Sequence, residues 1–172
     1  MMMQISELVK AQGGLVLSRK ETKASGNGGC PYKRLTIRAL TEDGEIDSSA
    51  LEDFCASETL NHAWFASPGD VVIRLSYEHL WEPAAIEEGQ EKLLVPSQLA
   101  ILKVKDCTIL LPEFLKISLS QKEIQEKIRR IESGTTQRVV KLGTIMELQI
   151  EVPDKETQRR VVEMDTLCRK KE

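Results

Sequence analysis

Side chains suited to binding an anion or reading a pattern of hydrogen-bonding groups gather in three short segments of this sequence. The segments are 19–34, 74–79 and 129–138, and their candidate contact residues are Lys20, Lys23, Lys33, Arg34, Arg74, Ser76, Arg130, Thr135, Thr136, Gln137 and Arg138. Arginine and glutamine can each hold the edge of a nucleic-acid base with two hydrogen bonds, whereas lysine and threonine suit phosphate contacts. For any one segment alone, an ordinary solvated surface is the alternative.

No spacing of residues in the sequence is typical of catalysis or of metal binding. The glycine-rich segment 25–29 lacks the Gly-Lys-Ser/Thr ending of a phosphate loop, and no Gly-x-Ser-x-Gly sequence is present. His62 and His79 have no cysteine or carboxylate partner at metal-ligand spacing. The carboxylates of 42–91 form no motif for general acid-base chemistry. The sequence therefore predicts no enzymatic activity, no metal and no cofactor.

Length and composition fit one domain inside the cell. The 172 residues are 41% hydrophobic, which is enough for a core, and they contain no apolar run long enough to span a membrane. The first residues, MMMQISELVKAQGG, lack the basic leader and cleavage site of a secretion signal. The four cysteines lie far apart without a Cys-x-x-Cys pair, which indicates reduced thiols. We therefore expect a cytoplasmic protein without a membrane anchor.

The net charge of −3 conceals an uneven distribution of charge along the chain. Residues 1–38 carry a net charge of +5, residues 39–102 carry −11, and residues 103–141 carry +4. If the fold brings the two basic segments onto one face and the acidic segment elsewhere, that face can meet a polyanion although the whole chain is acidic. The alternative is that these charges only solvate the surface.

The hydrophobic pattern predicts a sheet followed by helices. Expected strands cover 14–17, 33–38, 71–75, two runs within 93–104 that Pro96 separates, 139–140 and 148–152, with 109–111 closing the sheet. The spacing of Leu51, Phe54 and Cys55 favours a helix over 48–57. Pro112 and the capping-box sequence Ser120-Gln-Lys-Glu123 predict two consecutive helices at 113–119 and 122–131.

A last amphipathic helix is expected over 155–170. Its apolar stripe contains Val161, Val162, Met164, Leu167 and Cys168, of which Val161, Met164, Leu167 and Cys168 are the candidates for contact with a partner. The stripe could pair with a second copy of the chain and form a two-fold homodimer, or it could pack back on its own domain.

The order of these parts resembles the specificity subunit of type I restriction-modification systems, and in particular one of its target recognition domains. The resemblance rests on a lead-in that ends at Gly14, the strand and Asp-Gly turn of 32–47, the sequence Gly69-Asp-Val-Val-Ile-Arg-Leu-Ser76, the strand at 95–104, the helix start Leu111-Pro-Glu-Phe-Leu115, the glycine loop 133–137 and the helix entry Leu148–Gln158. The chain departs from the family pattern because Asp154 and Lys155 follow Pro153, where the family has a second proline. A full subunit also has two such domains and two long helices.

The resemblance implies an α+β fold with a mixed, mainly antiparallel β-sheet, flanking helices and a short C-terminal helix. Residues 1–153 would form the target recognition domain, and 154–172 the start of a conserved coupling and dimerisation helix. The implied function is sequence-specific binding of double-stranded DNA for a partner N6-adenine methyltransferase subunit, joined by a nuclease in the complete complex. The first candidates for DNA contact are then Arg74, Gln137 and Arg138.

A second function class stays open beside DNA recognition. The chain could be a protein-interaction module that binds the methyltransferase or a full specificity subunit without binding DNA. The acidic segment 39–102 and the aromatic content of 4% favour that alternative.

Overall fold

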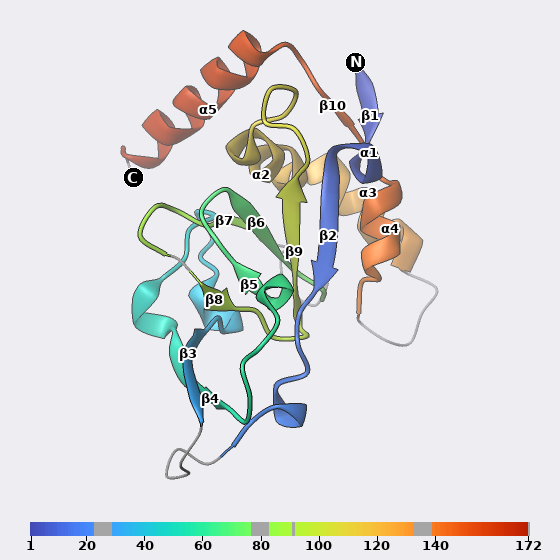
Figure 1. Cartoon of the computed structure of the whole chain (residues 1–172). Helices are drawn as coiled ribbons and strands as arrows, with labels where there is room; N and C mark the ends of the chain where they lie inside the picture. Colours follow the sequence, from blue (N-terminus) through green and yellow to red (C-terminus); the bar gives the residue numbers. More distant parts are fainter. Residues whose placement is uncertain (23–28, 77–82, 91, 133–138, 172) are drawn as a thin grey trace.

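The computed structural model describes residues 1–22, 29–76, 83–90, 92–132 and 139–171 (Figure 1). Its helices are α1 (Ile5–Leu8), α2 (Pro112–Ser120), α3 (Lys122–Glu132), α4 (Leu142–Glu147) and α5 (Lys155–Arg169). Its strands are β1 (Met2–Gln4), β2 (Val9–Gly13), β3 (Cys30–Arg34), β4 (Glu52–Ala56), β5 (Phe65–Ala66), β6 (Asp70–Arg74), β7 (Ala84–Ala85), β8 (Leu93–Leu94), β9 (Leu99–Val104) and β10 (Gln149–Glu151). The expected α+β class is confirmed.

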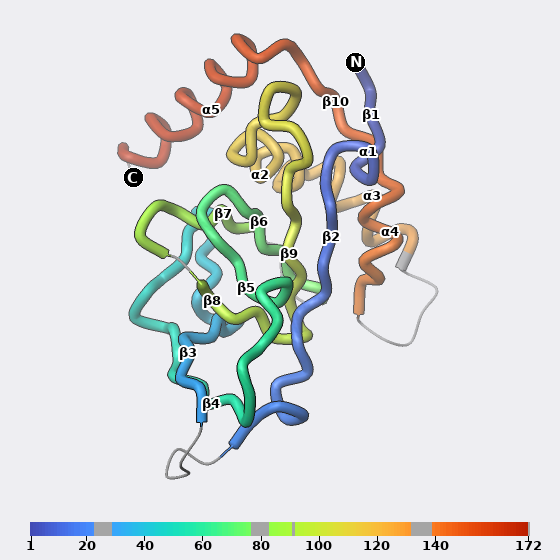
Figure 2. The backbone as a smooth tube through the Cα atoms, viewed as in Figure 1, coloured from blue at the N-terminus to red at the C-terminus, as the bar shows by residue number. Residues whose placement is uncertain are grey.

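The strands form three sheets that are mainly antiparallel. One four-stranded sheet has the order β2-β9-β6-β7, and all its neighbours are antiparallel. A second four-stranded sheet has the order β4-β3-β8-β5. In the part of the chain that the structure describes, β3 and β8 are parallel, and the other neighbours in this sheet are antiparallel. Strands β1 and β10 form a separate antiparallel pair that joins the N-terminal residues to the segment just before α5. The backbone tube in Figure 2 shows the first sheet beside helices α2 to α4, and the second sheet below it.

Strands β6 and β9 are buried on both faces, which explains their continuous apolar sequences. Val71, Ile73 and Leu102 face a core formed with α1 to α4 and β10. Val72 and Ile101 face a second core that β8 and the segment 35–46 complete. A strand covered on both sides needs apolar residues at every position, so its sequence does not alternate. The prediction of a buried strand over 71–75 is confirmed by β6.

The helical predictions for the second half of the chain are also confirmed. Pro112 occupies the first turn of α2, where its missing N–H leaves no hydrogen bond unmade. Helix α3 follows after Gln121, and Ile124 and Ile128 bury its apolar face. Helix α5 packs against α2 and lies across the top of the molecule in Figure 1. Within the part of the chain that the structure describes, no helix is both long enough and apolar enough to cross a membrane.

Several sequence predictions are wrong. The strand expected over 33–38 is β3, which ends at Arg34, and a 3₁₀ turn covers Ile37–Ala39. Residues 139–140 make no strand, since Val139 forms only an isolated bridge to Ser76.

Residues 48–57 form a short 3₁₀ turn, Ser48–Ala50, and then strand β4, because pairing with β3 overrides the helical spacing. Residues 14–17 do not form the expected strand. The strand in this part of the chain is β2, which covers Val9–Gly13 and ends directly before Gly14. Residues 109–111 make no strand, since the side chain of Asp106 accepts hydrogen bonds from Thr108 and closes a turn there.

Candidate nucleic-acid interface

A tight turn between β8 and β9 forms the centre of the candidate site. Pro96 is buried and accepts a hydrogen bond from the Leu99 N–H at 3.0 Å, which closes the turn. The carbonyl of Gln98 accepts from the N–H of Leu75 at 3.0 Å, just beyond the end of β6. The turn is therefore fixed to the central sheet, while the side chains of Ser97 and Gln98 remain exposed.

The chain that follows β2 presses against the same turn. The Gly14 N–H donates to the Leu99 carbonyl at 3.0 Å, and the Leu15 N–H donates to the Val95 carbonyl at 2.8 Å. A Cβ atom added at Gly14 would lie 1.9 Å from the carbonyl oxygen of Pro96. Only glycine lets the two backbone segments come this close. The physical role of Gly14, where the lead-in ends, is therefore to allow this backbone contact.

Two shallow hollows meet at this turn and bring predicted contact residues together. The first, of about 480 Å³, is lined by Arg34, Arg38 and Glu52 among others. The second, of about 560 Å³, is lined by Arg74, Ser76 and Val139 among others. Ile37, Ser97 and Gln98 line both hollows. We call the continuous region formed by Arg34, Arg38, Arg74, Ser76, Ser97 and Gln98 the arginine surface.

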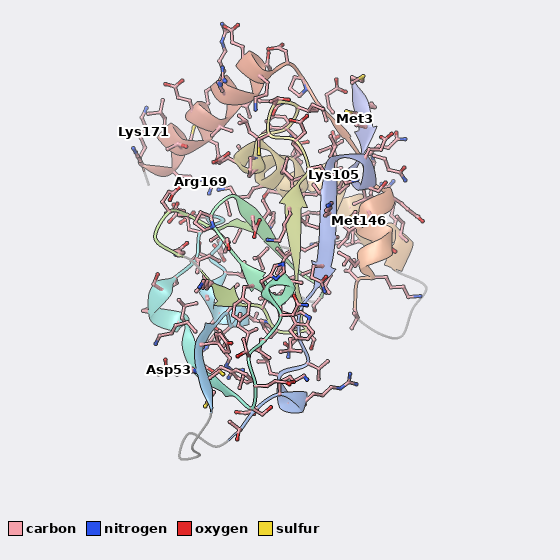
Figure 3. The ribbon with its side chains drawn as sticks, in the orientation of Figure 1. Met3, Asp53, Lys105, Met146, Arg169 and Lys171 are labelled. Atoms are coloured by element: carbon pink, nitrogen blue, oxygen red, sulfur yellow. The ribbon has the colours of Figure 1, made fainter. Side chains whose placement is uncertain are left out.

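The acidic segment supplies partners for several of the basic candidates. Across the β3-β4 pair, Lys33 Nζ lies 2.5 Å from Asp53 Oδ1, and Arg34 forms an ion pair with Glu52. Arg38 reaches the other oxygen of Glu52 at 3.5 Å, and Lys20 pairs with Glu58. Figure 3 shows Asp53 at the outer edge of this hairpin.

The possibility that acidic and basic segments occupy separate faces therefore does not hold for this part of the molecule. The physical reason is the register of β3 and β4, which places oppositely charged residues opposite each other. Such part-exposed ion pairs contribute only about 0–1 kcal/mol each, so a phosphate group can replace the carboxylate at small cost.

The structure brings together only some of the residues that the sequence nominates. Arg34, Arg74 and Ser76 lie on the arginine surface. Lys20 and Lys33 lie along the β3-β4 hairpin, and Arg130 is exposed on α3. Lys23, Thr135, Thr136, Gln137 and Arg138 fall outside the described residues. Their neighbour Val139 pairs with Ser76, and the Val140 N–H donates to the Leu75 carbonyl at 3.1 Å.

Arg38, Ser97 and Gln98 were missed by the sequence reasoning. A signal for the last two was present, because Pro96-Ser-Gln98 interrupts two apolar runs and so had to form an exposed turn. What the sequence could not show is that this turn lies between the ends of β3 and β6.

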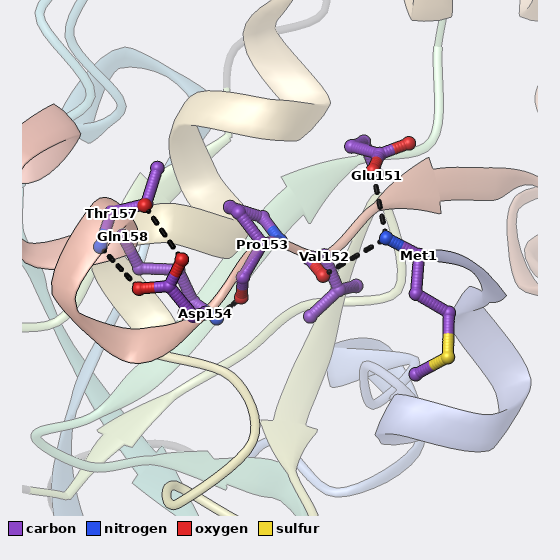
Figure 4. A network of polar contacts seen from close by, with 7 residues as sticks. All are labelled: Met1, Glu151, Val152, Pro153, Asp154, Thr157 and Gln158. Atoms are coloured by element: carbon purple, nitrogen blue, oxygen red, sulfur yellow. Dashed lines mark hydrogen bonds and ion pairs between the residues drawn. The ribbon is translucent and has the colours of Figure 1, made fainter.

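A buried glutamine attaches helix α5 to the rest of the molecule. Gln158 is fully buried, and its side chain donates to the carbonyls of Ile109 and Pro153 at 2.8 Å each. It also accepts from the Leu111 N–H at 2.9 Å. Asp154 caps the same helix by accepting from the Thr157 N–H at 2.9 Å (Figure 4). The entry Leu148–Gln158 therefore has a structural role that fixes where α5 leaves the domain.

The apolar residues of α5 divide between two sides of the helix. Val161 and Val162 pack against the main core. Met164 and Leu167 are 65% and 53% exposed, and Cys168 is exposed as well. One side of the helix thus packs back on its own domain, as one of the two sequence alternatives expects, and the other side presents apolar groups to solvent.

The described residues offer no group of His, Cys, Asp or Glu that could hold a metal ion. Asp47, Asp106 and Asp154 have pKa values below the ordinary value because nearby Ser or Thr residues donate hydrogen bonds to their carboxylates. These aspartates lie in turns and at a helix N-terminus, so they stabilise local structure.

The fold is that of solved proteins from type I restriction-modification systems, while no family model and no curated protein matches the sequence. A chain studied for the assembly and conformational transition of a type I system is 18% identical, with a TM-score of 0.66 over 99% of this chain. The HsdS subunit from Thermoanaerobacter tengcongensis is 16% identical, with a TM-score of 0.61 over 99% of this chain. The S subunit from M. genitalium is 15% identical, with a TM-score of 0.53 over 95%.

These comparisons confirm, at the level of fold, the resemblance that the sequence motifs indicated. The chain spans 38% of the first structure and 37% of each of the other two. It therefore corresponds in size to somewhat more than one third of such a chain.

Proposed function

We propose that this chain is a sequence-specific DNA-binding target recognition domain of the type I specificity-subunit kind. In this role it directs a partner N6-adenine methyltransferase, and a nuclease in the complete complex, to a DNA site. The observation that carries the proposal is the match of fold over 99% of the chain to specificity subunits. The arginine surface supports it, since cationic and amide side chains converge there on a rigid turn.

On this proposal, different residues of the arginine surface supply the affinity for DNA and the sequence preference. Arg34, Arg38 and Arg74 neutralise phosphates and supply an affinity that falls with salt concentration. The side chains between them face the bases and supply the sequence preference. The chemistry on DNA belongs to the partner, so the chain is not itself an enzyme.

The exposed side of α5 is our proposed coupling surface. Met164, Leu167 and Cys168 would pack against the methyltransferase subunit or against the same helix of a second copy. A homodimer would present two recognition surfaces related by a two-fold axis, and would read two half-sites. Because the substrate is the cell's DNA, we propose that the protein acts in the cytoplasm.

A second candidate function is a protein-interaction module that no longer binds DNA. The ion pairs of Arg34 and Arg38 with Glu52 favour it, because they already engage two of the cationic side chains. The two functions differ in one measurable property, which is binding of duplex DNA at low salt.

A gel-shift titration with a random-sequence duplex separates the two functions. The full chain is measured alone and together with a co-expressed methyltransferase subunit, over a range of salt concentrations. DNA recognition predicts binding at low salt, and a log-log salt slope that loses about one unit when Arg74→Ala removes a phosphate contact. Lys122→Ala, at a 90% exposed position at the start of α3 and outside the three candidate segments, is the matched control and should leave the slope unchanged. Absence of binding at low salt in both samples would eliminate DNA recognition and leave the interaction module.

A further inference from the structure

We propose that Gln98 is a specificity-determining residue that reads an adenine in the DNA site. This inference rests on the proposed function, and it concerns a residue at the centre of the arginine surface. Three features of this residue support the role: the position of its side chain, the constraint on its backbone and the hydrogen-bonding pattern of its carboxamide.

Gln98 occupies the place where the two hollows join. Arg34 and Arg38 line the hollow on one side of it, and Arg74 lines the hollow on the other. Its side chain is exposed, and among the described residues it makes no hydrogen bond. A duplex held by arginines on both sides would therefore bring its base edges over an amide with all its hydrogen-bonding capacity free.

The backbone beneath Gln98 is held from three directions. The turn closes on itself through the Leu99 N–H and the Pro96 carbonyl, and the Gln98 carbonyl accepts from Leu75 at the end of β6. Gly14 packs on the carbonyl of Pro96 from the third direction. A side chain on so constrained a turn loses little conformational entropy other than its own rotamer freedom when it binds.

The carboxamide selects the base. It offers an acceptor oxygen and a donor NH₂ side by side, which matches the N6 amino group and N7 acceptor that adenine presents in the major groove. Ser97 lies next to it and is equally exposed, but a single hydroxyl pairs with any base and cannot discriminate in the same way. Gln98 is therefore the residue on this turn whose hydrogen-bonding groups match one base.

The test compares the sites that the full-length chain and its variants select from a duplex library with a randomised stretch. The wild-type motif should contain an adenine whose replacement weakens binding by about 5- to 150-fold, the range for one bidentate base contact. Gln98→Ala should abolish the preference at that position alone, and should bind a scrambled duplex as tightly as wild type. Gln149→Ala, which removes an exposed glutamine on β10 outside the arginine surface, is the matched control and should retain the motif.

A modified base distinguishes direct reading from an indirect structural effect. Replacing the selected adenine by 7-deazaadenine removes the N7 acceptor, so it should weaken wild-type binding and leave Gln98→Ala binding unchanged. Equal weakening of both proteins, or a motif that Gln98→Ala leaves intact, would overturn the inference while DNA recognition itself stands. Failure of the wild-type chain to bind any duplex would instead overturn the proposed function, and this inference with it.

Discussion

Gly14 positions the arginine surface through the absence of a side chain. A Cβ atom there would meet the Pro96 carbonyl oxygen at 1.9 Å, and both partners are backbone, so neither can move away cheaply. We expect Gly14→Ala to destabilise the fold by about 1–3 kcal/mol or more, which is the cost of forcing atoms into a packed site. It should also displace the turn that carries Gln98 and weaken DNA binding beyond the loss of stability.

The neighbouring glycine provides the control for this substitution. A Cβ atom at Gly13 would have nothing within 4 Å, so Gly13→Ala should change stability by less than about 1 kcal/mol. Urea denaturation of both variants, followed by gel shifts on the folded proteins, makes the comparison. Equal stability of the two alanine variants would contradict the steric argument.

Lys116 is a buried cation that costs stability. Its side chain is 9% exposed, and its ammonium group has one long hydrogen bond, 3.5 Å, to the carbonyl of Gly44. Burial lowers its pKa below the ordinary lysine value, and the charge of Arg169 lowers it further. The carboxylates that act in the opposite direction are Asp165, Glu45 and Glu87.

Replacing this lysine should therefore stabilise the protein in a pH-dependent manner. At neutral pH we expect Lys116→Met to gain about 1 kcal/mol, because the buried charge is removed and most of the side-chain volume is kept. Between the lowered folded pKa and the unfolded value of 10.5, the unfolded chain binds more protons, so wild-type stability rises with pH and the advantage of the variant shrinks.

Chemical denaturation from pH 7 to pH 10.5 measures this trend. Lys122→Met, at a side chain that is 90% exposed, is the matched control and should show neither the gain nor the pH dependence. An advantage of Lys116→Met that grows with pH would contradict the direction of the pKa shift.

At the level of secondary-structure elements, helix α5 depends on one residue for its attachment. Gln158→Ala removes three buried hydrogen bonds and leaves the Leu111 N–H and the carbonyls of Ile109 and Pro153 without that partner. We expect a loss of about 2–4 kcal/mol in the free energy of unfolding. Arg159→Ala, at the exposed position that follows, should cost under about 0.5 kcal/mol. A similar midpoint of urea denaturation for both variants would show that the buried network is dispensable.

Elements with a strong local signal were predictable from the sequence. Helix α2 has Pro112 in its first turn, and the two faces of β6 are apolar without interruption. Helix α4 was not predicted, because Gly143 and Thr144 are poor helix formers and six residues carry little periodicity. Strand β4 was not predictable, because the spacing of Leu51, Phe54 and Cys55 fits a helix. Only the pairing with β3 decides between a helix and a strand there.

The candidate site was predictable only in part, for a related reason. The sequence nominates Arg34 and Arg74 as cations of two candidate contact segments, and both lie on the arginine surface. Gln98 did not stand out, since its importance comes from long-range neighbours. The partnership of Arg34 with Glu52 likewise follows from the strand register, which charge counts along the chain cannot reveal.

In the whole molecule, the arginine surface and the attachment point of α5 at Gln158 lie at opposite ends of β9. The strand begins at Leu99, directly after Gln98, and it ends at Val104, just before the segment whose carbonyls hold Gln158. Six residues of strand separate the two by roughly 20 Å at about 3.4 Å per residue. We therefore expect a partner on α5 to leave the arginine surface free, so that one chain can be coupled and bind DNA at the same time.

This separation leads to a prediction about the oligomeric state. If the exposed side of α5 pairs with its copy, Leu167→Glu should place two carboxylates in an apolar contact and convert the dimer to monomer. Sedimentation equilibrium should give twice the mass of the chain for wild type, and the mass of one chain for the variant. The DNA motif selected by the variant should shrink from two half-sites to one, while the half-site itself is unchanged, because Leu167 lies on α5 and outside the arginine surface.

Thr166→Glu adds the same charge one residue away, on the side of α5 that lines a cleft with Lys116 and Arg169. We expect it to remain dimeric, because Thr166 lies away from Met164 and Leu167 around the helix. A wild-type chain that stays monomeric at all concentrations would contradict pairing through α5. In that case the exposed apolar side of the helix would be left for the methyltransferase subunit, and co-purification of that subunit with wild type but not with Leu167→Glu would identify it as the partner.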